Sequence, residues 1–277
     1  MKSGKLFYLY IFLLLIVLIV MFFLRKQSHS KANHYLVRDY QQIKKSGELN
    51  AVTDYNSIGY FVSGDTVAGF QYELLRRLEK DWGIKVNIFL ENNLDENLKG
   101  LFSQRYDIVA RSIPINSELK NKVAFTQSII LNKQVLVQRK AEYNKGEKPI
   151  RQHLDLAKKT IYLPAHSPVI LRIDNLSHEI GDTIYVVQDP TYETEQLIMK
   201  VASGDIDFTV CDEKIAQKMA KRLPEIDVET DISFTQFDSW AVRKDSPVLL
   251  DSLNAWFTNL KQTKEFEQMR AKYFLSN

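Results

Sequence analysis

The chain has 277 residues, of which 45% are apolar and 26% are charged, with 10 glycines and 7 prolines. This is a globular composition, and it excludes a disordered, collagen-like or low-complexity chain. The single cysteine, Cys211, excludes an intramolecular disulfide and any multi-cysteine zinc or iron–sulfur site. The five histidines show no metal-ligand spacing such as HExxH, so the sequence predicts no metal site and no cofactor.

The basic surplus of the chain lies at its N-terminus. The formal net charge is +3, but four of the 37 basic side chains and none of the 34 acidic ones lie in residues 1–26. The rest of the chain therefore carries a net charge of −1, with both signs interspersed. Such a surface has no electrostatic footprint for nucleic acid, so we expect no nucleic-acid partner.

Residues 1–26 are predicted to be a transmembrane signal anchor. Leu6–Leu24 is an uncharged run of 19 residues, and a helix of that length spans the hydrocarbon core of about 30 Å. A cleaved signal peptide, the alternative, usually has a shorter apolar region and small residues at the cleavage site, whereas this run ends in Arg25-Lys26. We expect a single-pass protein of the cell membrane with its body in the periplasm. Residues 27–46 are polar and basic and are predicted to form a juxtamembrane linker.

Beyond this linker, strand-like and helix-like patterns alternate along the chain. Strands are predicted at 48–54, 85–90, 106–110, 124–130, 134–138, 160–163, 183–187, 207–211 and 237–243. Helices are predicted at 69–82, 95–104, 168–176, 191–202, 213–223, 248–260 and 264–274. This alternation indicates an α/β fold with mainly parallel sheets. The polar segment Lys140–Lys148 is a candidate hinge or lobe boundary.

Five motifs, in their order along the chain, resemble the family-3 solute-binding proteins. They are GELNAVTDY, VAGFQYELLRRLEKDWGIKV, YDIVARSIPINSE, SGDIDFTVCDEKIA and the closing segment that begins SWAVRKDSPVLL. The resemblance spans about Gly47 to Phe274. Within the family, Asn116-Ser117-Glu118 and the overall spacing are most similar to the N-terminal regulatory domain of membrane-bound lytic murein transglycosylase F. That domain precedes a catalytic domain, which we do not expect here because the sequence ends at Asn277.

The resemblance implies a two-lobed type II periplasmic-binding-protein fold for residues 47–277. Lobe one would comprise about 47–138 and 236–277, and lobe two about 139–235. In such a fold the ligand binds between the lobes, and a hinge motion closes them around it.

Two positions depart from the amino-acid-binding members of the family. By the resemblance, an arginine twelve residues after Asp107 holds the ligand carboxylate, and a Ser or Thr seven residues after Asp107 donates to it. This chain has Leu119 and Pro114 there, which counts against a free amino acid as the ligand. Arg111 could supply the missing guanidinium, although an ion pair with a surface carboxylate explains it equally well.

The resemblance places further residues in the cleft. Asp212 matches the second-lobe acid that pairs with a ligand ammonium, although a helix N-cap requires the same residue type. Ser167 with Pro168 begins a helix whose backbone N–H groups face the ligand in the family, although a plain cap explains the pair as well. The loop residues that complete the predicted ligand-binding set, with ordinary loop packing as their alternative, are Asp54, Tyr55, Tyr60, Ser112, Asn116 and Thr191.

No sequence motif indicates an enzyme. The chain has no GxSxG, no GxxxxGK[ST] and no GxGxxG, so we predict no catalysis. We expect a membrane-anchored periplasmic sensor that binds a muropeptide or stem peptide and acts through a partner such as a cell-wall enzyme. Two alternatives stay open. One is an ABC-importer binding component for an amino acid or another small polar solute, and the other is an interaction scaffold whose cleft binds nothing.

Overall fold

The computed structural model describes residues 20–21, 38–115, 117–165 and 167–275. The predicted membrane segment Leu6–Leu24 lies outside these residues except for Val20 and Met21. In the part of the chain that is described, no helix combines the length and the apolar character needed to cross a bilayer.

The folded body begins at Arg38, earlier than the predicted residue 47. Helix α2 (Tyr40–Ser46) lies within the segment predicted to be a linker. Asp39 and Gln42 form a reciprocal capping box at its start, and Gly47 ends it with a φ of 71°. The side chain of Ile43 is fully buried, so this helix is part of the hydrophobic core rather than a solvated linker.

The first lobe is built on a sheet with the strand order β4-β1-β5-β13-β6, in which β7 also pairs with β13. Its strands are β1 (Glu48–Thr53), β4 (Lys85–Leu90), β5 (Ile108–Pro114), β6 (Ala124–Phe125), β7 (Ile130–Asn132) and β13 (Gln236–Val242). Strands β4 and β5 are parallel to β1, whereas β13 is antiparallel to β5. A hairpin of β2 (Phe61–Ser63) and β3 (Thr66–Ala68) stands apart from this sheet.

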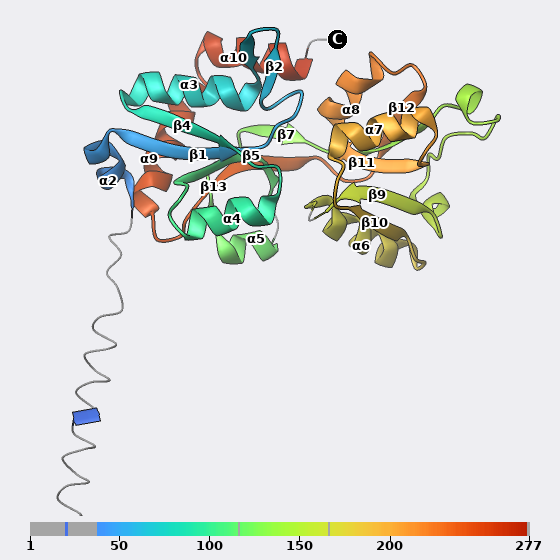
Figure 1. Cartoon of the computed structure of the whole chain (residues 1–277), viewed down its shortest axis with the longest axis horizontal. Helices are drawn as coiled ribbons and strands as arrows, with labels where there is room; N and C mark the ends of the chain where they lie inside the picture. Colours follow the sequence, from blue (N-terminus) through green and yellow to red (C-terminus); the bar gives the residue numbers. More distant parts are fainter. Residues whose placement is uncertain (1–19, 22–37, 116, 166, 276–277) are drawn as a thin grey trace, which may run out of the picture. The chain divides into compact units, whose positions relative to one another are not determined.

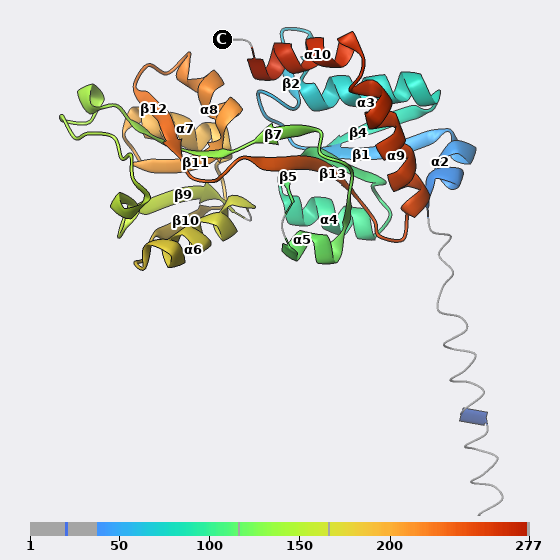
Figure 2. The same cartoon turned by 180° about the vertical axis from the view of Figure 1, so that it is seen from behind.

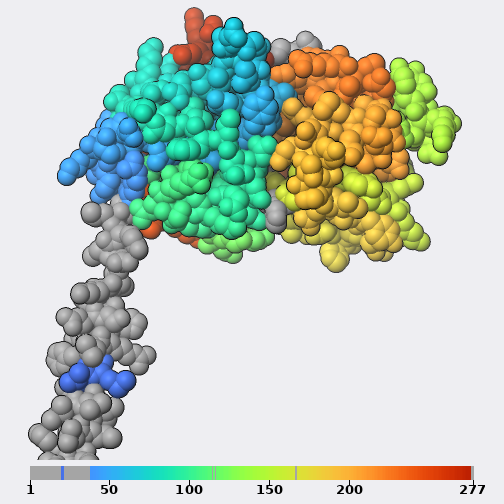
Figure 3. Space-filling model, viewed as in Figure 1, coloured from blue at the N-terminus to red at the C-terminus, as the bar shows by residue number. Residues whose placement is uncertain are grey.

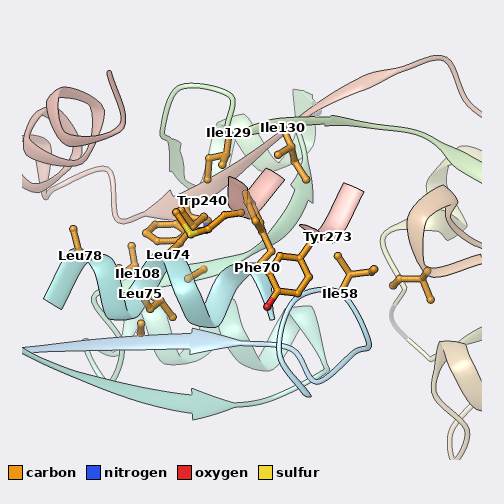
Figure 4. Close-up of a cluster of buried hydrophobic side chains, with 14 of the residues drawn as sticks. Ile58, Phe70, Leu74, Leu75, Leu78, Ile108, Ile129, Ile130, Trp240 and Tyr273 are labelled. Carbon is orange, nitrogen blue, oxygen red and sulfur yellow. The ribbon is translucent and has the colours of Figure 1, made fainter. Parts of the chain in front are cut away.

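Helices cover both faces of the first sheet (Figure 1). They are α3 (Phe70–Trp82), α4 (Leu94–Phe102), α5 (Ser117–Lys122), α9 (Pro247–Leu260) and α10 (Lys264–Arg270), followed by a π-helical turn at Ala271–Leu275. Helix α3 follows from its sequence, because Phe70, Leu74, Leu75 and Leu78 share one face and are all fully buried. Figure 4 shows this face packed against Trp240 of β13, whose indole Nε1 donates to Gln71 Oε1 over 2.7 Å.

The second lobe is built on a sheet with the order β10-β9-β11-β8-β12. Its strands are β8 (Gln134–Arg139), β9 (Thr160–Pro164), β10 (Tyr185–Asp189), β11 (Phe208–Asp212) and β12 (Ile226–Asp231). Its helices are α6 (Val169–Ile180), α7 (Thr194–Ser203) and α8 (Glu213–Ala220), with 3₁₀ turns at Ala141–Tyr143 and His153–Leu156. The α/β architecture with two sheets agrees with the expected fold class.

The chain passes between the two sheets twice, after β7 and after β12 (Figure 2). The first passage is at Lys133, because β8 already pairs with β11 and β12 of the second sheet. The predicted first lobe, 47–138, is therefore too long. The predicted hinge Lys140–Lys148 follows β8 and belongs to the second lobe. Its polar composition reflects a surface loop rather than a connection between lobes.

Candidate functional site

A small cavity lies between the two sheets, lined by both lobes. Its polar lining residues are Asp54, Asn56, Gln71, Ser112, Asn132, Asp212 and Lys214, and its apolar ones include Ile58, Phe70, Ile215 and Phe274. The cavity has a volume of about 20 Å³, which is room for about one water molecule. Ligand pockets usually measure about 300–1,000 Å³. In this arrangement of the lobes, the cavity itself therefore has no room for a larger ligand.

Arg111 of β5 is paired within the first lobe. Its Nη2 lies 3.1 Å from Asp54 Oδ2, and its Nη1 donates to the Asn92 carbonyl oxygen over 2.7 Å and to Asn97 Oδ1 over 3.2 Å. Asp54 Oδ2 also accepts from Asn56 Nδ2, but Asp54 Oδ1 is buried and has no hydrogen-bond partner among the described residues. The guanidinium expected to hold a ligand carboxylate thus holds a protein carboxylate, and the acceptor Asp54 Oδ1 is left at the cavity.

Asp212 lies at the cavity from the side of the second lobe. It ends β11 and precedes α8, but its side chain makes no capping hydrogen bond to that helix. Instead, Oδ1 accepts a short hydrogen bond from Gln134 Nε2. Burial, and next the negative charge of Asp54, raise the pKa of Asp212. The side chain is therefore directed to the region between the lobes, as the resemblance implies.

Asp238 is a third carboxylate of this region, and the sequence analysis missed it. Only 3% of Asp238 is exposed, and its Oδ2 accepts from Asn132 Nδ2 over 3.1 Å. Burial, followed by the charge of Asp212, raises the pKa of Asp238 to about 7, against hydrogen bonds from Asn132 and Ser112 that lower it. A polar residue inside an apolar strand, as in QFDSWAV, is the signal that could have found it.

Asp54 Oδ1 is a buried acceptor at the cavity without a hydrogen-bond partner among the described residues. Gln134, which donates to Asp212, also has a buried acceptor without such a partner, Oε1. An unpartnered buried acceptor is costly, about 1–3 kcal/mol. The described residues contain no group of three or more His, Cys, Asp or Glu arranged for a metal ion. The arrangement therefore suits a ligand group that donates hydrogen bonds, such as an ammonium.

Four predicted site residues do not line the cavity. Tyr55 is exposed, and its backbone N–H donates to Asn92 Oδ1. The Tyr60 ring packs edge-on against Tyr72 of α3, with 5.6 Å between the centroids. Ser167 Oγ accepts from the Val169 N–H at the start of α6. The N–H groups of Thr191 and Tyr192 donate to Asp189 Oδ1 and lower the pKa of Asp189.

The contacts of these four residues are those expected from ordinary loop packing and helix capping. The structure brings Asp54, Arg111, Ser112 and Asp212 together instead. Asn116 lies outside the described residues.

Asp107 and Leu119 belong to the interior of the first lobe. Asp107 precedes β5 and is fully buried, and its Oδ1 accepts from Arg38 Nε over 2.9 Å while Arg243 Nη2 lies 3.5 Å away. The strand that follows Asp107, β5, runs from Ile108 to Pro114. Leu119 is buried in the core beside α4. Cys211 is buried too, which raises the pKa of its thiol well above the usual value and makes it a poor nucleophile.

The two-lobed fold and its cavity are those of a solute-binding protein. Residues 49–276 match the bacterial extracellular solute-binding proteins, family 3, and the chain belongs to this family. A membrane-bound lytic murein transglycosylase F of Desulfosudis oleivorans is 24% identical over 233 residues, which cover 84% of this chain and 50% of the relative. The same enzyme of Photobacterium profundum is 26% identical over 247 residues, covering 85% and 45%. This chain thus spans about half the length of the curated relatives it matches.

Solved structures share the fold at low sequence identity. A variant of ArgBP from T. maritima has a TM-score of 0.73 and 21% identity, covering 85% of this chain and 99% of that chain. An ancestral arginine-binding protein bound to arginine has a TM-score of 0.72 and 22% identity, covering 82% and 98%. At this level of identity the likeness shows the fold alone, and the ligand has to be argued from the residues of the cavity.

Proposed function

We propose that this protein is a membrane-anchored periplasmic sensor that binds a peptide fragment of the cell wall, a stem peptide or a muropeptide, between its two lobes. It passes the signal to a partner protein, such as a cell-wall enzyme, without catalysis of its own. The observation that carries this proposal is a cavity between the lobes that carboxylates line from both sides, Asp54 and Asp212. The murein named in the curated relatives supports the ligand class.

The pairing of Arg111 argues against a free amino acid. A free amino acid carries its carboxylate next to its ammonium, so its binding site needs a cation beside the acid that holds the ammonium. Here Arg111 is engaged by Asp54, Asn92 and Asn97. The residue at the usual arginine position, Leu119, is buried and apolar. A peptide avoids this conflict, because its terminal carboxylate is several bonds away from its terminal ammonium.

A second candidate is an ABC-importer binding component for a cationic amino acid. The relative bound to arginine and the acidic groups around the cavity favour it, because a cationic side chain would place positive charge near Asp212 and Asp238. This candidate still requires a cation for the ligand carboxylate, which the surroundings of Arg111 do not offer in this arrangement of the lobes.

Ligand-dependent stabilisation of the full chain tests the proposed ligand class. We would measure thermal unfolding in mild detergent with muropeptides, stem peptides, the common amino acids and dipeptides. A ligand at 100 times its Kd stabilises the folded state by about 2.7 kcal/mol. We expect stabilisation by wall fragments that is lost in Asp212→Asn and kept in Glu118→Gln, a change at an exposed ion pair. Stabilisation by arginine or another free amino acid alone would favour the importer. If no compound of the panel stabilises the protein, the result would favour an interaction scaffold whose cleft binds nothing.

Membrane anchoring needs a separate test. We expect the full chain to sediment with the membrane fraction and to resist alkaline extraction, and a chain without residues 1–26 to be released in soluble form. An external protease added to cells with a permeabilised outer layer should degrade the body while the inner membrane is intact. Protection of the body under these conditions would contradict the periplasmic orientation.

A further inference from the structure

A basic groove runs along α8 and the C-terminal segment. It has a volume of about 810 Å³, and five cations line it, Lys214, Lys218, Lys221, Arg222 and Lys272, together with apolar side chains. No aspartate or glutamate is among the residues that line it. A groove of this volume is within the range of about 300–1,000 Å³ that is typical of ligand sites, and its charge favours an anionic occupant.

Nearby acids pair with at least two of the cations that line this groove. Lys214 Nζ lies 3.3 Å from Glu213 Oε2, and Lys272 Nζ lies 2.6 Å from Glu73 Oε1. Burial, and next the positive charge of Arg222, lower the pKa of Lys218. Cations are therefore close enough to repel one another, and an anion bound among them would relieve this repulsion.

The groove and the acidic cavity adjoin each other. Three residues, Ile58, Lys214 and Phe274, line both. The two linings together place carboxylates at one end and most of the cations at the other, with Lys214 where they meet. The cavity end has the unpartnered Asp54 Oδ1 and the carboxylate of Asp212, and the groove end has the cations of α8. Both ends take residues from both lobes, so a ligand that fills the site contacts the two lobes together.

We propose that the ligand is an extended peptide with a free N-terminus, as in a free stem peptide, whose terminal ammonium lies in the cavity and whose carboxylates lie in the basic groove. This inference rests on the proposed function and specifies the charge pattern that the site selects. It also explains how the apolar residue Leu119 can stand at the usual position of the arginine. The carboxylate that a family arginine would hold beside the ammonium is held further out, by Lys218 and Arg222, at the opposite end of the ligand.

A series of matched peptides tests the charge pattern without altering the protein. The probes are Ala-Ala-Glu, its N-acetyl derivative, and Ala-Ala-Gln amide, each titrated into the full chain by calorimetry. Acetylation removes the buried charge and should weaken binding by about 30-fold or more. Neutralising the carboxylates should weaken it by about two- to tenfold, and this loss should shrink at high salt because the groove is open to solvent.

Charge reversal on the protein tests the groove. Arg222 is exposed, and Arg222→Glu should weaken Ala-Ala-Glu by about two- to tenfold while leaving Ala-Ala-Gln amide unchanged. Lys45→Glu is the matched control, because Lys45 is also an exposed cation and lies on α2, away from the groove lining. It should change neither affinity.

The outcomes separate this inference from the proposed function. Binding of stem peptides that is insensitive to acetylation or to Arg222→Glu would overturn the inference and leave the wall-sensor function standing. Binding of Ala-Ala-Glu with the expected charge dependence, but of no wall fragment, would support the inference and overturn the wall-sensor function. Absence of binding by every peptide would overturn both.

Discussion

Ser57 of the first lobe donates its backbone N–H to Oε1 of Glu195 in the second lobe, over 2.7 Å. The carbonyl oxygen of the same residue accepts a short hydrogen bond from Nζ of Lys218. Glu195 belongs to α7 and Lys218 to α8, so two helices of the second lobe contact one residue of the loop after β1. Figure 3 shows the surfaces of the two lobes meeting. These contacts require closed lobes, and they stabilise that arrangement.

Removing the Glu195 carboxylate should favour the open arrangement. A hydrogen bond to a charged group contributes about 1.5–3 kcal/mol. Glu195→Ala should therefore increase the radius of gyration measured by small-angle X-ray scattering and weaken ligand binding by about tenfold or more. Glu195→Gln keeps an acceptor oxygen and should give a smaller change. Identical scattering curves for Glu195→Ala and the unchanged protein would contradict a role of this contact in closure.

Asp238 should make stability depend on pH. It keeps its proton in the folded protein up to a pH of about 7, whereas an unfolded aspartate loses its proton near pH 4. Between these values the folded state binds more protons, so the free energy of unfolding falls as pH rises. Asp238→Asn cannot ionise. Its free energy of unfolding, relative to the unchanged protein, should rise by up to about 4 kcal/mol between pH 4 and pH 8.

Urea titrations at several pH values measure this difference. Asp65→Asn is the control for the loss of a carboxylate as such, because Asp65 is exposed between β2 and β3. The raised pKa of Asp212 acts in the same direction, so Asp212→Asn should show a similar trend. A flat difference for Asp238→Asn would show that Asp238 ionises normally in the folded protein.

Hydrophobic periodicity predicted the elements that bury a continuous apolar face. The predicted helix 69–82 is α3, because one of its faces is buried and Gly83 ends it with a φ of 59°. Strand β12 was not predicted, because the acids in its sequence, IDVETD, are typical of a surface loop. Helix α2 was assigned to the linker because Ile43 is its one buried residue, and one buried residue gives no clear periodic signal. The first boundary between the lobes was predicted after β8 and not before it, because β8 is as apolar as a strand of either sheet.

The candidate site was predicted only where the resemblance supplied it. Asp54, Arg111 and Asp212 lie close together in the structure, but the role of Arg111 depends on its contacts with Asn92 and Asn97, which lie nearby in three dimensions and not in sequence. Asp238 could not be assigned from local pattern, because it reaches the site through the return of β13 to the first sheet. The groove was missed for the same reason, since it combines α8 with the distant C-terminal segment.

Asp107 should be a stabilising residue without a role in ligand binding. Asp107→Ala would leave Arg38 and the buried Arg243 without their carboxylate. Removing one member of a buried ion pair costs about 3–5 kcal/mol. We expect this loss in urea unfolding, with an unchanged Kd for any ligand at temperatures where the variant is folded. Glu118→Ala at an exposed ion pair should cost less than about 1 kcal/mol. A variant of full stability that loses ligand binding would instead place Asp107 in the site.

Gly69 should tolerate substitution less than a described glycine that has open space around it. Its φ is 135°, its N–H donates to the Tyr273 hydroxyl over 3.0 Å, and a Cβ there would overlap the carbonyl group of Gly59. Gly69→Ala combines backbone strain with a clash, and we expect a cost of about 3 kcal/mol or more.

The matched control for this change is Gly47→Ala. Gly47 also has a positive φ, of 71°, but a Cβ there would meet nothing within 4 Å, so only strain of about 1–2 kcal/mol should remain. Because Gly59 and Ser57 share the loop after β1, Gly69→Ala should also weaken ligand binding, whereas Gly47→Ala should not. Urea unfolding and calorimetry of both variants measure the two effects. Equal losses of stability would show that the loop moves away from the new methyl group at little cost.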